Sequence, residues 1–242
     1  MIDCTTEPCD WYIYQPGLLE QDLLTLPLLG GLVAAVSLTT EPPAQPLWPF
    51  KGELNDGGRN PSRQPGYLAL GMGAAVMAPF AAYIWEESKG EVSIWTQARG
   101  LLHAHLLTEL VTISSKNFFG RRRPFYDNEA ADRRVGTDDR RSFFSGHASH
   151  AANLAAYGIT VAWQEIDNKA VAWTFTGLFG LTAGWIGTSR AFDGQHHWSD
   201  VIAGAAVGGA IGYAIARRVD AVSHEESHLT FTPTGVQWRI NF

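Results

Sequence analysis

Four long stretches of the chain carry no charged residue, and this feature most restricts how the chain can fold. They are Leu23 to Thr40, Tyr67 to Trp85, Ala170 to Ser189 and Val201 to Ala216. Each approaches the length that an α-helix needs to cross a bilayer. Each is also rich in small residues, which suit helices packed closely in a soluble bundle. Because the mean hydropathy of the chain is only −0.08, the pattern favours a soluble or peripheral protein over an integral membrane protein.

Length and composition restrict the class of protein further. The chain has 242 residues, of which 45% are hydrophobic, with nine Trp and twelve Phe. This is enough apolar material for one large core and excludes disorder of the whole chain. The net charge of −6 argues against a general nucleic-acid partner, which needs a basic surface.

Apolar residues at helical spacing predict an all-α protein, a bundle of about six core helices. The expected helices cover residues 23–38, 67–85, 92–118, 145–163, 170–188 and 198–217. Residues 39–66 are rich in Pro, Gly, Asn and Asp and predict a long exposed loop. Gly204, Gly208 and Gly212 predict a close helix contact, and residues 229–242 predict a short β-hairpin about Pro233 to Gly235.

Positive charge is concentrated in one segment of this acidic chain. Residues 116–141 contain eight basic and five acidic residues, a local charge of +3, whereas the remaining chain carries −9. This predicts a local site for an anion. The alternative is a solvated loop whose charges pair with one another.

The anion site is expected to draw on three segments at helix ends. In the first, Lys116 supplies a point charge and Arg123 a planar fork for two phosphate oxygens, while Pro124 ends the helix. In the second, Ser145 is a candidate N-cap, and Gly146 allows backbone N–H groups to approach an anion. His147 follows in the first turn.

The third segment, residues 189–200, combines Arg190 with two adjacent histidines and an aspartate. Asp200 is four residues after His196 and three after His197, so its carboxylate can orient either imidazole and raise the basicity of the opposite ring nitrogen. Spacing alone leaves both histidines open as the nucleophile or base.

Together these segments resemble a known family. Lys-x6-Arg-Pro at 116–124, Ser-Gly-His at 145–147 and Ser-Arg-x5-His-x3-Asp at 189–200 are similar to the signature of the type 2 phosphatidic acid phosphatase superfamily. That superfamily includes lipid phosphatases, bacterial class A nonspecific acid phosphatases and vanadium haloperoxidases. The chain departs from the family at Phe144, where the family usually has Pro before Ser-Gly-His.

The resemblance implies a role for each matching residue. His196, chosen over His197 by its spacing from Arg190, would be the nucleophile on phosphorus, Asp200 would orient it, and His147 would be the general acid. The residues implied in holding the phosphoryl oxygens are Lys116, Arg123, Ser145, Gly146 and Arg190. No metal or other cofactor is expected, although vanadate is a candidate inhibitor.

The resemblance also implies a function, a domain organisation and a location. We expect a metal-independent phosphatase that hydrolyses a phosphate or pyrophosphate ester of a lipid or small molecule through a phosphohistidine, at a membrane surface on the periplasmic side of the cell envelope. Residues 67–217 would form the catalytic domain, after an N-terminal extension (1–66) and before a C-terminal tail (218–242).

Three other functions compete with this interpretation. One is a vanadate-dependent haloperoxidase, in which vanadate is the prosthetic group. A second is a non-catalytic binder of anionic lipid headgroups. A metal hydrolase would instead gather ligands from His147, His150, His196, His197 and Asp200, but three nearby cations would repel a divalent ion.

Several residues are expected to lie outside the site. His103 and His105 are two apart, face in different directions on a helix and are interpreted as structural. His224 and His228 are expected at the surface. Cys4 and Cys9 form a small disulfide loop or two free thiols. No signal peptide is visible at the start of the chain, which leaves open that one has already been removed.

Overall fold

The computed structural model describes residues 16–57, 66–87, 94–128, 136–223, 227–232 and 235–240. Cys4, Cys9 and His224 lie outside these ranges, so the expectations made for them stay predictions. The same holds for the turn expected about Pro233 to Gly235, since residues 233 and 234 are not among those described.

Six long α-helices form the body of the protein and confirm the expected all-α bundle. They are α1 (Pro16–Thr39), α2 (Gly66–Glu87), α3 (Ile94–Phe119), α4 (Gly146–Glu165), α5 (Lys169–Phe192) and α6 (Trp198–Ser223). A short 3-10 turn, η2 (Asp138–Arg140), precedes α4. Strands β1 (Ser227–Thr232) and β2 (Gly235–Ile240) pair antiparallel after α6.

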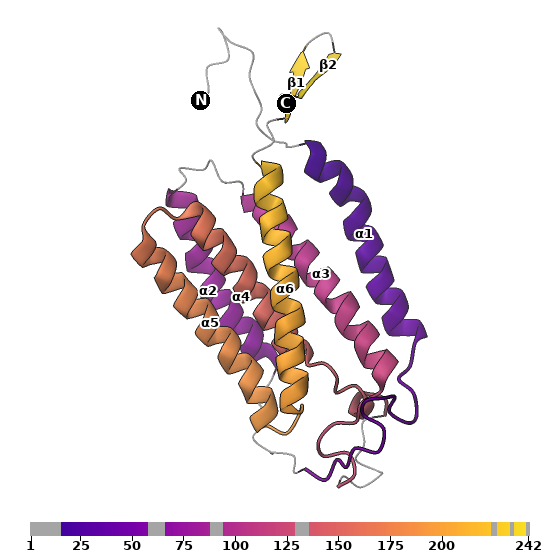
Figure 1. Ribbon diagram of the computed structural model, residues 1–242. Helices are drawn as coiled ribbons and strands as arrows, with labels where there is room; N and C mark the ends of the chain where they lie inside the picture. The colour runs from indigo at the N-terminus through magenta and orange to yellow at the C-terminus, as the bar shows by residue number, and fades with distance from the viewer. Residues whose placement is uncertain are drawn as a thin grey trace.

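Successive helices run in alternating directions, so their ends gather at the two ends of the bundle (Figure 1). One end collects the C-terminal ends of α1, α3 and α5 and the N-terminal ends of α2, α4 and α6. The segments 40–57 and 120–145 lie at the same end (Figure 1). The three segments predicted to form the anion site therefore come to one end of the molecule.

Helix α4 is the centre of the bundle and packs most extensively against α6 and α5. The contact with α6 depends on the glycines of α6. A Cβ atom at Gly204 would lie 2.6 Å from the backbone oxygen of Ser145, and one at Gly208 or Gly212 would collide with the backbone of α4. The close helix contact predicted from these three glycines is confirmed.

The hydrophobic core lies between α2, α4 and α5. Phe80 of α2 packs edge-on against Phe175 and Phe179 of α5, with ring centroids 5.0 and 5.2 Å apart. Tyr157 and Val161 of α4 complete this cluster. Because aromatic side chains bury large apolar areas, this cluster contributes much of the free energy that stabilises the bundle.

The segment 40–57 is largely exposed, as expected, but it is docked onto the end of the bundle. The backbone N–H of Leu47 donates to the carbonyl of Phe119, and that of Gly57 donates to the carbonyl of Pro124. Phe50 packs against the rings of Phe119 and Phe143. The segment thereby covers the chain between α3 and α4.

Three helices are long and apolar enough to cross a membrane: Leu68–Glu87, Lys169–Phe192 and Trp198–Val219. Their outward faces carry large apolar side chains, among them Leu70, Leu181 and Ile202, which are 77%, 76% and 65% exposed. Large apolar side chains exposed on helices of this kind mark contact with a membrane or another protein.

Candidate active site

The residues predicted for the site come together where α3 and α5 end and α4 and α6 begin. Lys116 is in the last turn of α3, Arg190 in the last turn of α5 and Asp200 in the first turn of α6. The N-termini of α4 and α6, together with the cations Lys116, Arg123 and Arg190, favour the binding of an anion at this position.

Asp200 is the hub of the polar network at this end of the bundle. Its side chain is fully buried. One carboxylate oxygen accepts hydrogen bonds from the Ser142 hydroxyl (2.5 Å) and the His197 backbone N–H (3.1 Å), and the other accepts from Arg121. A carboxylate with this many donors is held in one orientation.

The imidazole of His196 is oriented mainly by a backbone carbonyl. Its Nδ1 lies 2.8 Å from the carbonyl oxygen of Ser142 and 3.7 Å from the nearer oxygen of Asp200. Because a carbonyl only accepts hydrogen bonds, Nδ1 must carry the proton and Nε2 the lone pair. Asp200 thus acts on His196 partly through Ser142, an indirect connection that the four-residue spacing did not predict.

Burial keeps His196 neutral. The side chain is 4% exposed, and this desolvation lowers the pKa of His196 to about 4. The positive charges of Arg123 and Lys116 also lower the pKa, whereas Asp200 opposes the shift. At neutral pH the ring is therefore an unprotonated base with a free lone pair at Nε2.

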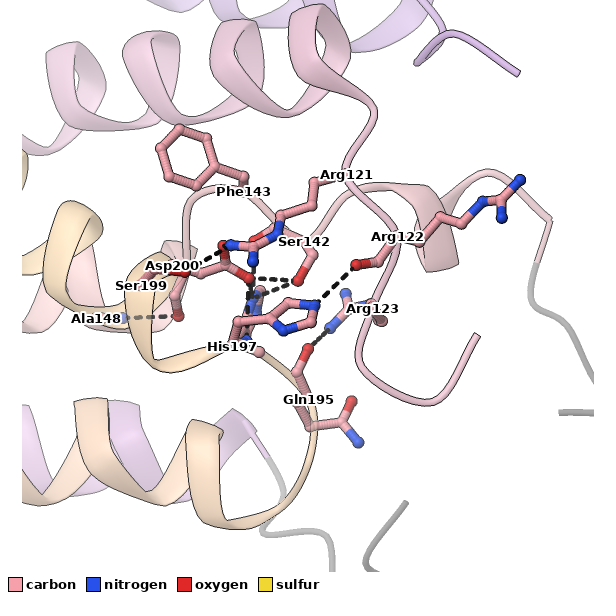
Figure 2. A network of polar contacts seen from close by, with 12 residues as sticks. Arg121, Arg122, Arg123, Ser142, Phe143, Ala148, Gln195, His197, Ser199 and Asp200 are labelled. Carbon is pink, nitrogen blue, oxygen red and sulfur yellow. Dashed lines mark hydrogen bonds and ion pairs between the residues drawn. The ribbon is translucent and has the colours of Figure 1, made fainter. Parts of the chain in front are cut away.

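Arg121 is a site residue that the motifs did not single out. It is buried, and its guanidinium donates to Asp200 and to the Ser199 hydroxyl at 2.7 Å (Figure 2). It also donates to Glu53 at 2.5 and 2.8 Å. Burial opposes its charge, but the bonds to Glu53 and Asp200 prevail and raise the pKa of Arg121. Glu53, a residue of the docked segment 40–57, is thus connected through Arg121 to the hub.

Arg123 is buried and positioned by three hydrogen bonds. It donates to the Gln195 carbonyl at 3.0 Å (Figure 2), and to the backbone and side-chain oxygens of Asp138 at 3.1 and 2.9 Å. Within the described residues, three of its five N–H groups are used, and one on each terminal nitrogen is open to an anion. In contrast, Nε2 of His197 lies 3.2 Å from the carbonyl oxygen of Arg122 (Figure 2).

The N-terminus of α4 faces Lys116. Ser145 is the N-cap, and its hydroxyl accepts a 3.4 Å hydrogen bond from the Ala148 N–H. A Cβ on Gly146 would lie 3.4 Å from the ammonium nitrogen of Lys116. Glycine at this position therefore lets an anion approach both the backbone of the first turn and the lysine.

His147, in the first turn of α4, lies near both Lys116 and Arg190. It lines a small recess with Ser189 and Arg190 and also lines a larger cavity with Lys116 and Gly146. Burial, with the positive charges of Arg190 and Lys116, lowers the pKa of His147 to about 4. An anion bound among these cations would oppose that shift.

The larger cavity has a volume of about 680 Å³ and extends from the site into the bundle. Its walls come from α2, α3, α4 and α5 and are mostly apolar, including Leu70, Met77, Leu154 and Phe179. It contains one polar cluster away from the motifs, formed by His105, Glu109 and His150. His105, interpreted from the sequence as structural, thus borders the cavity.

Much of the charge in residues 116–141 is used within the protein. Arg121, Arg122 and Arg123 form ion pairs with Glu53, Asp127 and Asp138. Arg140 donates to the carbonyls of Pro42 and Pro43, and Arg141 to the side chain of Asn117. Among the described residues of this segment, the cations expected at the anion site are thus Lys116 and Arg123, the latter also paired with Asp138, and Arg190 joins them from the end of α5.

The five residues considered as metal ligands are separated by their hydrogen bonds. His150 is paired with Glu109, whereas His197 is directed at a backbone carbonyl. Among the residues that the structure describes, no group of three or more His, Cys, Asp or Glu side chains is arranged to hold a metal ion.

Comparisons with known proteins agree with the motifs. A family model described as the PAP2 superfamily matches residues 97–223, slightly more than half of the chain. The chain is also 32% identical over 150 residues to a protein of Schizosaccharomyces pombe called probable diacylglycerol pyrophosphate phosphatase 1, covering 52% of this chain and 54% of the relative. This chain spans about half the length of that relative. No solved structure matches this chain. From the family match, the chain belongs to the PAP2 superfamily.

Proposed function

We propose that this protein is a phosphatase that removes a terminal phosphoryl group from a lipid phosphate or pyrophosphate. The observation that carries the proposal is the convergence of two histidines and three cationic side chains at the N-terminus of α4. Phosphoryl transfer depends on positioning and on stabilising charge on the equatorial oxygens, and such a set of groups supplies both.

In the first step, His196 attacks phosphorus. Its Nε2 lone pair forms the P–N bond while the bond from phosphorus to the leaving oxygen breaks, and Nδ1 keeps its proton on the Ser142 carbonyl. His147 donates a proton to the leaving oxygen. The cations Lys116, Arg123 and Arg190, with the backbone at Ser145 and Gly146, hold the phosphoryl oxygens.

In the second step, water hydrolyses the phosphohistidine. His147, now unprotonated, accepts a proton from the water as its oxygen bonds to phosphorus, and the P–N bond breaks to release phosphate and the neutral His196. The low pKa of His147 suits this second role, and the negative charge of the bound phosphoryl group favours the protonated form needed in the first.

The reaction as proposed uses no metal ion. Two arginines and one lysine supply the positive charge that a divalent cation provides in other phosphatases. We further propose that vanadate, which resembles phosphate, binds the same residues as an inhibitor.

A lipid substrate is supported by the cavity and by the relative. The cavity of about 680 Å³ opens beside Lys116, Gly146 and His147 and continues between apolar walls. A hydrocarbon chain fits such walls because burying it removes apolar surface from water. The name of the fission yeast relative also refers to a lipid pyrophosphate.

We propose that α2, α5 and α6 span a membrane, with the site near one interface. On α5, Trp173 and Phe192 are 64% and 72% exposed and about 28 Å apart at 1.5 Å per residue, close to the thickness of a bilayer core, about 30 Å. Trp173 pairs with Trp163 at one end, and Phe192 with Trp198 at the other. Aromatic residues at both ends of a span are typical of membrane interfaces.

The proposal is tested by trapping the phosphoenzyme. Purified protein in detergent micelles is mixed with 32P-labelled phosphatidate, quenched in alkali, where phosphohistidine survives, and separated by electrophoresis. The wild type should carry label and turn over, whereas His196→Gln should carry none and lose at least 1,000-fold in kcat.

His197→Gln is the matched control, because the adjacent histidine bonds a backbone carbonyl and should keep label and turnover. Labelling that persists in His196→Gln would contradict the assignment. Loss of activity in EDTA that zinc restores would overturn the metal-free reaction.

A further inference from the structure

Three side chains form a polar cluster inside the apolar cavity. Nδ1 of His105 lies 2.9 Å from Nδ1 of His150, and Nε2 of His150 lies 2.8 Å from a carboxylate oxygen of Glu109. The two rings are stacked, with centroids 5.2 Å apart. These residues match none of the motif positions, and the proposed mechanism does not use them.

The cluster has unused hydrogen-bonding positions. His150 uses both ring nitrogens, but within the described part of the chain the second oxygen of Glu109 and Nε2 of His105 have no hydrogen-bond partner. The side chains of His150 and Glu109 are 32% and 39% exposed, and all three residues line the cavity. A ligand in the cavity can therefore reach them.

The cluster lies a short distance from the phosphate-binding residues. His150 is one turn beyond His147 on α4, a rise of about 4.5 Å. On α3, His105 and Glu109 precede Lys116 on the same face, with Glu109 about 10 Å from it along the axis. Both residues at the near end, Lys116 and His147, line the same cavity.

We propose that this cluster binds the free glycerol hydroxyl of a glycerolipid phosphate and selects such a lipid over lipids whose phosphate is attached directly to hydrocarbon. This rests on the proposed phosphatase function. In a monoacylglycerol phosphate the free hydroxyl is two carbons from the phosphate ester oxygen, and on α4 the cluster begins at His150, one turn from His147. Glu109 and the free nitrogen of His105 both accept from a hydroxyl, since burial, with the charge of His150, lowers the pKa of His105 to about 4 and leaves its ring neutral.

The selectivity follows from the desolvation of polar groups. When a hydrocarbon chain fills the cavity, the free positions of Glu109 and His105 lose water and gain no partner, which is unfavourable. A glycerol hydroxyl replaces that water by donating a hydrogen bond. A site built to hydrogen-bond its substrate rejects an analogue without the polar group more strongly than an apolar pocket does.

The test compares two single-chain substrates of equal length, a monoacylglycerol phosphate and an alkyl phosphate, in the same micelles. We expect the wild type to favour the glycerol compound at least tenfold in kcat/KM. The double variant Glu109→Leu/His150→Leu should lower this ratio about tenfold. His103→Leu, the same substitution on the opposite side of α3 where the side chain bonds Thr25, should leave the ratio unchanged.

The ratio separates selectivity from folding, because partial misfolding lowers both rates together. Equal rates on the two substrates in the wild type would overturn the inference without any variant. An unchanged ratio in the double variant would overturn it as well. If the wild type hydrolyses neither these two substrates nor phenyl phosphate, the proposed function itself fails. If it hydrolyses phosphate esters but has equal kcat/KM values for the monoacylglycerol phosphate and the alkyl phosphate, only this inference fails.

Discussion

At the scale of single residues, the protonation of His196 depends on two neighbours. The Ser142 carbonyl fixes the proton on Nδ1, and burial removes the water that would stabilise an imidazolium. Asp200 holds the Ser142 hydroxyl at 2.5 Å and thereby the backbone that orients the ring. A neutral ring with one defined tautomer is the form that a nucleophile on phosphorus requires.

We expect the His196 ring to titrate near pH 4. Since its pKa is lowered to about 4 from an ordinary value of 6.5, the ring stays neutral as the pH falls from 7 to 5 and protonates only below that range. 15N NMR of histidine-labelled protein in micelles gives both the pKa and the tautomer, with the signal assigned by its loss in His196→Gln. A midpoint near 6.5, or a proton on Nε2, would contradict the geometry.

At the scale of elements, the contact between α4 and α6 sets the position of the site. Gly208 lies against the backbone of Ser149, one turn from the α4 residues that face the anion site. The Ser145 backbone N–H also donates to the carbonyl of Asp200 at 3.1 Å. Close backbone approach therefore joins the beginning of α4 to the hub on α6.

Two adjacent glycines of α6 provide a matched pair of substitutions. Gly208→Ala would place a methyl group in the Ser149 backbone, whereas the position beside Gly209 is open. We expect Gly208→Ala to lower the free energy of unfolding by ~1–3 kcal/mol through overpacking. Gly209→Ala should leave it unchanged or raise it by up to about 1 kcal/mol, as alanine favours helices.

Denaturant titration in detergent, followed by circular dichroism, measures both changes. The same variants should differ in activity, because separation of α4 from α6 moves Ser145 away from Asp200. Equal stability of the two variants would show that the helices do not pack as closely as described.

At the scale of the whole molecule, polar groups concentrate at one end of a bundle whose sides are apolar. Leu181 lies midway along α5 and is 76% exposed, a position that would face lipid if α5 spans a bilayer. The docked segment 40–57 lies at the polar end of the molecule (Figure 1). Leu54 belongs to this segment and is 72% exposed.

We expect Leu181→Lys to reduce membrane insertion, since a lysine at the centre of a span costs about 2.5–3.5 kcal/mol. Leu54→Lys, an equal change outside the span, should have no effect. The measurement is the fraction of protein retained in membranes after an alkaline carbonate wash. Recovery of the wild type in the soluble fraction without detergent would contradict the membrane proposal.

The sequence by itself determined the helices and the family of the protein. Helix positions follow from the periodicity of apolar residues, which acts locally. The helix end predicted at Pro124 was wrong, because α3 already ends at Phe119, where Gly120 takes a φ of 61° that favours glycine. The residues of the three motifs were also found by spacing, because each motif lies within one short segment at a helix end. Gly204, Gly208 and Gly212 predicted the helix contact for the same reason.

Only the tertiary structure decided which distant side chains meet. Arg121 joins Glu53 to Asp200 across more than 60 residues on one side and more than 70 on the other, and nothing in its local sequence separates it from Arg122. His105 and Glu109 have the four-residue spacing of one helix face, but their partner His150 lies on another helix. Such contacts depend on how helices pack, which is set by the summed burial of many side chains rather than by any one spacing.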